Sequence, residues 1–136
     1  MKKLVQAIAK LIMSMESMEE EAKVKFNLKE LTLTQMNYLE MISQLGNPNF
    51  TELASHMGLS KPTVTVAVEK LIKRNFIHKV KSISDRRNSR LYLTERGQLI
   101  NEIHDYAHRM MAKLISKKLN RDEIDFLVQI FNRVMG

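Results

Sequence analysis

Apolar residues recur along this chain with helical spacing, and capping or turn residues mark the breaks between the runs. Residues 2–25 predict one long helix whose apolar positions step by four and three residues: Leu4, Ile8, Leu11, Met15, Met18 and Ala22. Thr32 and Gln35 have capping-box spacing and predict the start of a second helix. Gly46 and Pro48 end that helix, since Gly suits a C-terminal cap and Pro cannot continue the helix.

Two shorter helical patterns follow, separated by a tight turn. Thr51 is expected to open the first, and Gly58 suits the left-handed residue that ends it. Ser60 is expected to cap the second helix, Lys61–Arg74, whose first turn tolerates Pro62. Its expected buried stripe is Val64, Ala67, Val68 and Leu71. Two helices joined by so short a connection form a helix-turn-helix pattern.

Next come two segments with the alternation of β-strands. Phe76–Lys81 and Arg90–Thr94 are rich in β-forming residues, and they flank a polar, charged loop. They predict a β-hairpin, and a hairpin directly after a helix-turn-helix is a wing. A long helix is expected from Thr94 to about Leu119, and Asn120 is expected to cap a final helix.

The expected fold is therefore mainly α with a small β-hairpin wing: a winged helix-turn-helix with N- and C-terminal dimerisation helices. We expect residues 31–94 to form the DNA-binding region and residues 1–30 with 95–136 to form a helical dimerisation region, in a single compact chain. The long apolar stripes of the terminal helices exceed what a winged-helix core can cover. They therefore favour pairing across a two-fold axis, as a homodimer.

Charge and composition narrow the function. The net charge is +7, and the segment from Lys61 to Arg96 alone carries +7, so the rest of the chain is neutral. A positive field confined to about a quarter of the chain indicates a polyanion-binding face.

The chain has no cysteine, which excludes disulfides, thiol catalysis and thiolate metal sites. Gln6 and Lys10 interrupt the apolar N-terminus, and no apolar run reaches membrane-spanning length, so we expect a cytoplasmic protein.

The second helix of a helix-turn-helix, here Lys61–Arg74, enters the major groove of DNA, and a basic loop beside it can enter the minor groove. Thr and Val groups can touch thymine methyls, while Lys meets phosphates or guanine edges. In the loop, Asp85 is interpreted as a strut that orients one of the neighbouring guanidinium groups of Arg86 and Arg87. The candidate DNA-binding residues are Ser60, Lys61, Thr63, Thr65, Val66, Lys70, Lys79, Lys81, Asp85, Arg86, Arg87 and Arg90.

Taken in order, these motifs resemble the MarR family of transcriptional regulators. The matching pieces are Leu31–Gln35, Glu52–Ala54, Leu59–Thr65, Asp85–Arg87 and Leu93–Gly97. The resemblance implies a homodimeric repressor of a palindromic operator, often released by a small effector bound between the DNA-binding region and the dimer helices. It places Ser60, Thr63 and Thr65 at the groove, and Asp85 and Arg87 in the wing.

The chain departs from the family pattern in two places. Asn75 stands where the family often has Gly before the first wing strand, but Asn tolerates a positive φ. Lys79 stands where the family often has Arg, which puts a bidentate contact there in doubt.

Other functions remain as alternatives. No catalytic constellation or cofactor motif stands out, so an enzyme is not expected. His104 and His108 have the i, i+4 spacing of metal ligands but lack a third ligand at fixed spacing, so polar or interface histidines are favoured and no metal is assigned. An architectural protein that coats DNA without sequence choice would share the charge pattern. A winged helix used for protein contacts would not need this charge.

Overall fold

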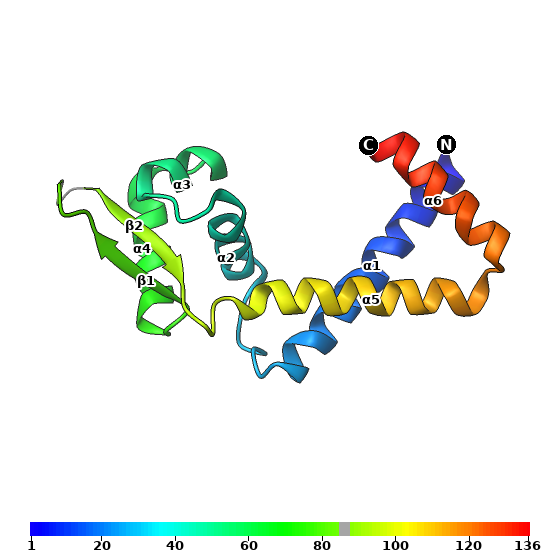
Figure 1. The fold of residues 1–136 in the computed structure, drawn as a ribbon, viewed down its shortest axis with the longest axis horizontal. Coiled ribbons are helices and arrows are strands. Elements are labelled where there is room, and N and C mark those ends of the chain that lie inside the picture. The colour runs from blue at the N-terminus through cyan, green and yellow to red at the C-terminus, as the bar shows by residue number, and fades with distance from the viewer. Residues whose placement is uncertain (85–87) are drawn as a thin grey trace. The chain divides into compact units, whose positions relative to one another are not determined.

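The structure is a computed structural model of the 136-residue chain, and it describes residues 1–84 and 88–136 (Figure 1). Residues 26–102 form one compact unit, and residues 1–25 with 103–136 form the other. The elements follow in the order α1 (Lys2–Lys25), α2 (Leu33–Leu45), α3 (Phe50–Met57), α4 (Lys61–Lys73), β1 (Ile77–Lys81), β2 (Ser89–Leu93), α5 (Leu99–Lys118) and α6 (Arg121–Met135).

The unit of residues 26–102 has its own apolar core. Helices α2, α3 and α4 and the two strands all contribute side chains that are almost completely removed from water. These include Leu39, Ile42, Leu53, Val64, Val68, Leu71, Ile77 and Leu91, and Phe76 joins them from the turn before β1. The mainly α architecture with a β-hairpin, predicted from the sequence, is confirmed.

Local capping explains most of the helix boundaries in this unit. Thr32 and Gln35 form both hydrogen bonds of the predicted capping box at the start of α2. Ser60 caps α4 as predicted, and Gly58 ends α3 with a φ of +66°. The prediction that Thr51 opens α3 was wrong, because the side chain of Asn49 accepts the Glu52 N–H and starts the helix at Phe50 instead.

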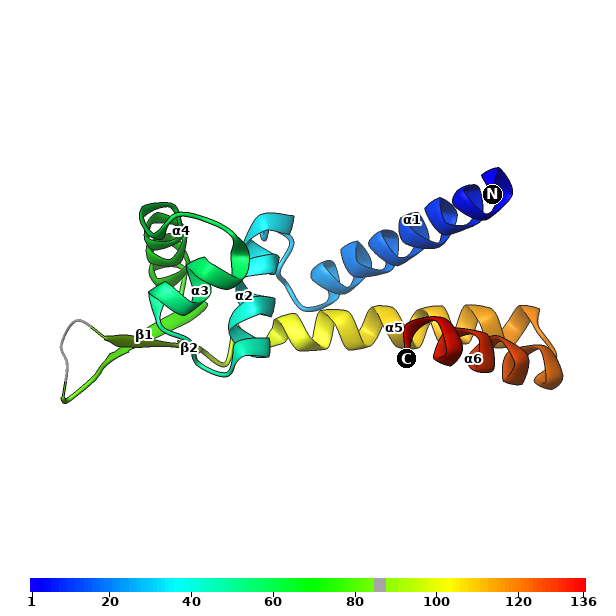
Figure 2. The same cartoon turned by 90° about the horizontal axis from the view of Figure 1, so that it is seen from above.

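Strands β1 and β2 pair antiparallel, with Ile77 opposite Leu93 and Lys81 opposite Ser89. A short third segment joins the far side of β2, where the Leu91 N–H donates to the carbonyl of Pro48 at 2.9 Å. The hairpin lies beside helices α2, α3 and α4 in both views (Figures 1 and 2). An isolated β-bridge between Asn49 and Arg90 thus joins the segment before α3 to the wing.

The connection from β2 to α5 differs from the prediction. The helix was expected to begin at Thr94, but α5 begins at Leu99. The hydroxyl of Thr94 accepts the Gly97 N–H at 3.0 Å and donates to the carbonyl of Asn75 at 2.6 Å, so it caps a separate turn. Gly97 permits this turn because a Cβ there would clash with the carbonyl oxygen of Phe76. Asn75 adopts the expected positive φ, +64°.

The other unit contains α1, most of α5, and α6. It buries few apolar side chains, namely Ala22, Ile103 and Ala107, and α6 buries none. The predicted capping box of Asn120 and Glu123 starts α6. The imidazole Nδ1 of His104 lies 3.4 Å from the carboxylate of Glu19. Within the described residues, no helix is both long and apolar enough to cross a membrane.

Candidate nucleic-acid interface

Helix α4 presents one face to the core and the opposite face to solvent. Val64, Val68 and Leu71 are fully buried. Successive residues of a helix turn by about 100° around its axis, so Val66 and Lys73 lie opposite this buried stripe. Both are exposed, as is Pro62 one turn before Val66. Ala67, expected in the buried stripe, is only half-buried.

The hydroxyl groups at the start of α4 are engaged within the helix. Ser60 Oγ accepts the Thr63 N–H at 3.3 Å and lies 2.8 Å from Thr63 Oγ1. The hydroxyl of Thr65 donates to the carbonyl of Lys61 at 2.9 Å. These bonds fix the first turn of α4, where a recognition helix would approach base edges.

The basic residues of the segment from Lys61 to Arg96 fall into two groups. Lys79 lies 3.2 Å from the Glu69 carboxylate, and Arg90 lies 3.0 Å from that of Glu52. Arg74 and Arg96 are paired with an acidic residue of the same unit, as described below. Four others are exposed and have no ion pair among the residues that the structure describes: Lys61, Lys70, Lys73 and Lys81. Their charge remains available to a polyanion.

Three predicted site residues, Asp85, Arg86 and Arg87, lie outside the described residues. The remaining predicted residues of the wing strands, Lys79, Lys81 and Arg90, are exposed. The structure thus brings the exposed side of α4 and both wing strands into one unit. The assignment of these residues to DNA binding stays a prediction.

The start of β2, next to the wing loop, is tied to the start of α3 by side chains. Asn49 accepts the Glu52 N–H through Oδ1 at 2.7 Å and donates through Nδ2 to Asn88 Oδ1 at 3.0 Å. Arg90 donates to Glu52 and, at 3.4 Å, to the carbonyl of Asn47. One asparagine therefore both caps α3 and holds the strand that leaves the wing loop.

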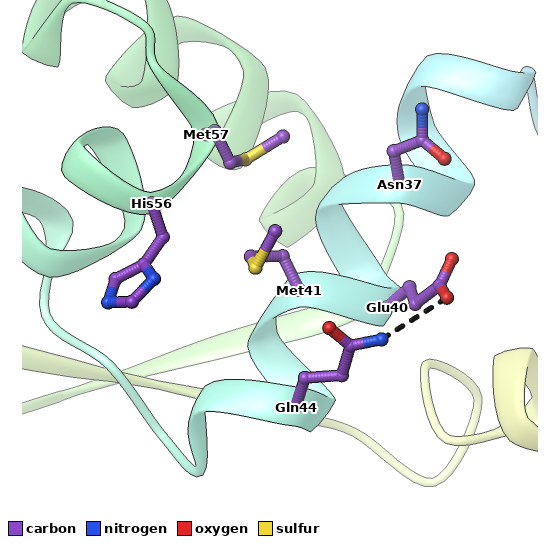
Figure 3. A pocket seen from close by; sticks show the side chains of 6 residues that line it. All are labelled: Asn37, Glu40, Met41, Gln44, His56 and Met57. Carbon is purple, nitrogen blue, oxygen red and sulfur yellow. Dashed lines mark hydrogen bonds between the residues drawn. The ribbon is translucent and has the colours of Figure 1, made fainter. Parts of the chain in front are cut away.

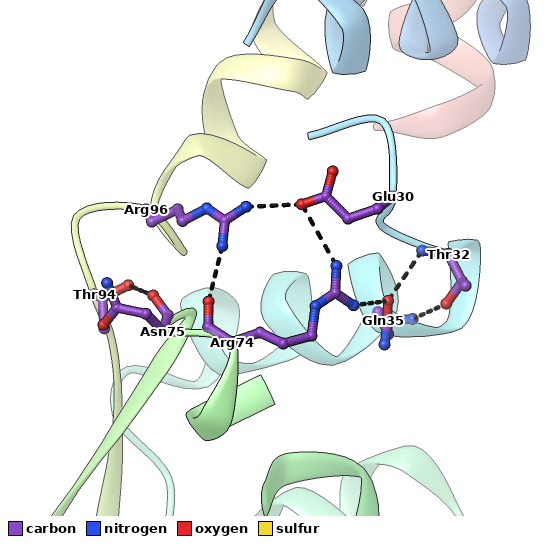
Figure 4. Close-up of polar contacts among 7 residues, drawn as sticks. All are labelled: Glu30, Thr32, Gln35, Arg74, Asn75, Thr94 and Arg96. Atoms are coloured by element: carbon purple, nitrogen blue, oxygen red, sulfur yellow. Dashed lines mark hydrogen bonds and ion pairs between the residues drawn. The ribbon is translucent and has the colours of Figure 1, made fainter. Parts of the chain in front are cut away.

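A second polar cluster surrounds Glu30 (Figure 4). Its carboxylate lies 2.7 Å from Arg96 and 3.5 Å from Arg74, and Arg96 also donates to the carbonyl of Arg74 at 2.8 Å. Arg74 completes the cluster by donating to Gln35 at 2.9 Å. A backbone hydrogen bond of Glu30 itself, followed by the charges of Arg96 and Arg74, lowers the pKa of this carboxyl. These two arginines hold the C-terminus of α4 and are not free cations.

An open pocket of about 370 Å³ lies between α2 and α3 (Figure 3). It is lined by Asn37, Glu40, Met41, Gln44, His56 and Met57. Gln44 donates to Glu40 at 3.3 Å, and the two thioethers supply the apolar surface. Such a mixture suits a small molecule with both polar and apolar parts. In the described part of the chain, no group of three or more His, Cys, Asp or Glu side chains could hold a metal ion.

Sequence reasoning omitted two features of this surface. Lys73 follows Val66 by seven residues, so helical periodicity could have placed it on the same face. The bond between Asn49 and Asn88 joins residues 39 positions apart, and no local pattern reveals it.

Comparison with known proteins connects this surface to a family. Residues 31–89 match the model of the MarR family. The chain is 30% identical over 99 residues to an HTH-type transcriptional regulator of Bacillus subtilis strain 168, YvnA, which is named as uncharacterized. That match covers 73% of this chain and 63% of YvnA, so the chain spans less than two thirds of this curated relative.

Solved structures share the fold. RV1404 from Mycobacterium tuberculosis superimposes with a TM-score of 0.83 at 19% identity, over 100% of this chain and 94% of that one. FabT from Streptococcus pneumoniae, solved in complex with DNA, has a TM-score of 0.70 at 21% identity, over 98% of this chain and 91% of FabT. These neighbours confirm the predicted winged-helix fold.

Proposed function

From the membership of this chain in the MarR family of transcriptional regulators, we propose that it represses transcription by binding a specific duplex operator as a homodimer. The exposed lysines of α4 carry the proposal, because Lys61, Lys70 and Lys73 have no ion pair among the described residues. The predicted partner of this face is the phosphate backbone beside a major groove. The charged wing loop is proposed to reach the adjacent minor groove.

A second copy of the chain is the proposed cover for the apolar surface of the other unit. Phe126 is 63% exposed and Phe131 is 42% exposed on α6, and Leu4, Ile8 and Leu11 are exposed on α1. Large apolar side chains exposed in this number promote association. Two-fold pairing would place the α4 helices about 34–36 Å apart, or a multiple of that, and so favour a palindromic operator.

The proposal extends to regulation and location. By family resemblance, a small effector of unassigned identity is proposed to release the repressor from its operator. The pocket between α2 and α3 lies beside the helix-turn-helix and is a candidate for such binding. A chromosomal operator would place the protein in the cytoplasm of a bacterial cell.

Selection of bound duplexes from a random-sequence library tests the function. The full chain should enrich an inverted repeat and prefer it to random duplex by at least about 10³-fold. Its affinity should fall with salt at a log–log slope of about −0.9 per phosphate neutralised. Equal competition by random duplex would instead support a non-specific architectural protein, and a flat salt response would contradict DNA binding by this surface.

A further inference from the structure

The exposed face of α4 has an apolar strip at its N-terminal half. Val66 is 58% exposed, although valine is usually buried, and Pro62 is exposed one turn before it. Both lie opposite the buried residues Val64 and Val68. This strip therefore occupies the part of a recognition helix that comes closest to base edges.

The polar groups around the strip have few hydrogen-bond donors to offer. The hydroxyl of Thr65 already donates its hydrogen bond to the carbonyl of Lys61. Ser60 and Thr63 bond to each other, so one of their two hydroxyl protons is used between them. Helix α4 contains no Asn, Gln or Arg, so Lys is the one side-chain type in it that can form a bidentate pair with a base, and its partner there is guanine. Its exposed lysines are compact charges on flexible stems, which meet phosphates or guanine edges and make no contact specific to thymine.

Only one group on the major-groove edges of unmodified DNA is apolar, the C5-methyl of thymine. We infer that the strip formed by Pro62 and Val66 contacts thymine methyl groups and so recognises thymine. This inference rests on the proposed function. The operator half-site accordingly carries thymines at the positions that face this strip. Contact of Val66 with a methyl removes apolar surface of both partners from water, and each buried methyl contributes roughly a three- to fourfold gain in affinity.

Replacement of thymine by uracil in the selected duplex tests this inference directly. Uracil lacks only the C5-methyl, so base pairing and the minor-groove edges are unchanged. The probe is the duplex that the wild-type chain enriches from the random library, with each thymine replaced singly. At one or two positions per half-site, we expect the wild-type chain to bind the uracil duplex roughly three- to fourfold more weakly.

Two variants assign the effect to the strip. Val66→Ala should bind the thymine and uracil duplexes equally at the sensitive position, because its contact with the methyl is gone. Lys70→Gln should weaken binding to both duplexes by the same factor and keep the preference for thymine, since its proposed contact is a phosphate. Both side chains are exposed, and an unchanged thermal unfolding midpoint confirms that each variant is folded.

The outcomes separate the inference from the proposed function. The inference is wrong if the wild-type chain enriches a sequence but tolerates uracil at every position, or if Val66→Ala keeps the full thymine preference. Either result leaves the proposed function unaffected. If the wild-type chain enriches no sequence, the proposed function is wrong. Loss of affinity at defined thymines, abolished by Val66→Ala alone, supports the inference.

Discussion

The two units of this chain differ in how far they bury their apolar side chains. Residues 26–102 enclose a core drawn from three helices and two strands, and their exposed apolar residues are scattered, such as Leu33 and Val66. The unit of residues 1–25 and 103–136 exposes most of its large apolar side chains, and α6 buries none. The first unit buries most of its apolar side chains within itself, whereas the second leaves most of its large apolar side chains exposed. This contrast suggests a division between DNA recognition and self-association.

The largest expected effect comes from polar substitution on the exposed side of α6. Phe126→Asp combined with Phe131→Asp should weaken self-association by roughly 100- to 1,000-fold, because two aromatic anchors would be replaced by charges in an apolar interface. Sedimentation velocity across a concentration series measures this change. Leu33→Ser is the matched control, since Leu33 is 67% exposed in the other unit. Equal self-association of the wild type and the double variant would contradict the assignment of self-association to the unit that contains α6.

The next effect belongs to the wing loop. Replacing Arg86 and Arg87 together with Ala should weaken binding of the selected duplex strongly while the dimer stays intact, because two cations proposed to enter the minor groove are lost. Fluorescence anisotropy with the duplex, at fixed salt, gives the affinity. Exposed lysines of α5, Lys113 and Lys117, provide a control pair whose replacement by Gln should have little effect. Unchanged affinity of the arginine variant would refute the role of the wing.

A smaller effect is expected at Asn88, where the wing loop meets β2. Asn88→Ala removes the acceptor for Asn49 Nδ2 but leaves the cap of α3 in place. A hydrogen bond of this kind contributes about 0.5–1.5 kcal/mol, so DNA affinity should fall at most about tenfold. Hydroxyl-radical footprinting should show weaker protection of the outer, wing-facing positions than of the centre of each half-site. Asn37→Ala, on the exposed side of α2, should leave the footprint unchanged; a uniform loss of protection in Asn88→Ala would argue against a positioning role.

The smallest effect concerns the Glu30 cluster. Because the folded state lowers the pKa of Glu30 below its ordinary value of 4.5, the cluster stabilises the fold above that pH and loses this contribution as the pH falls through the lowered value. Glu30→Gln should therefore lower the thermal midpoint slightly at pH 7, with the difference from wild type shrinking in acid. Glu16→Gln, on the exposed surface of α1, serves as the control. A difference that persists unchanged in acid would mean that the charge of Glu30 does not matter.

Local signals in the sequence explain why so much of the fold was predictable. The capping boxes at Thr32 and Asn120, and the cap at Ser60, depend on residues three positions apart. They therefore appear directly in the order of the amino acids. The helical and strand periodicities locate the winged helix-turn-helix for the same reason. The errors lie at Thr51 and Thr94. Helix α3 begins earlier because Asn49 caps it, and the hydroxyl of Thr94 bonds to the carbonyl of Asn75 and caps a separate turn before α5.

By itself, the sequence determined the elements, their order and the concentration of positive charge between Lys61 and Arg96. Only the tertiary structure decided which of those charges are used internally. Arg74 and Arg96 meet Glu30, and Arg90 meets Glu52, across 38 to 66 residues of chain. Such pairing depends on where folding brings distant segments together, because Coulomb attraction acts over distance in space and not along the chain.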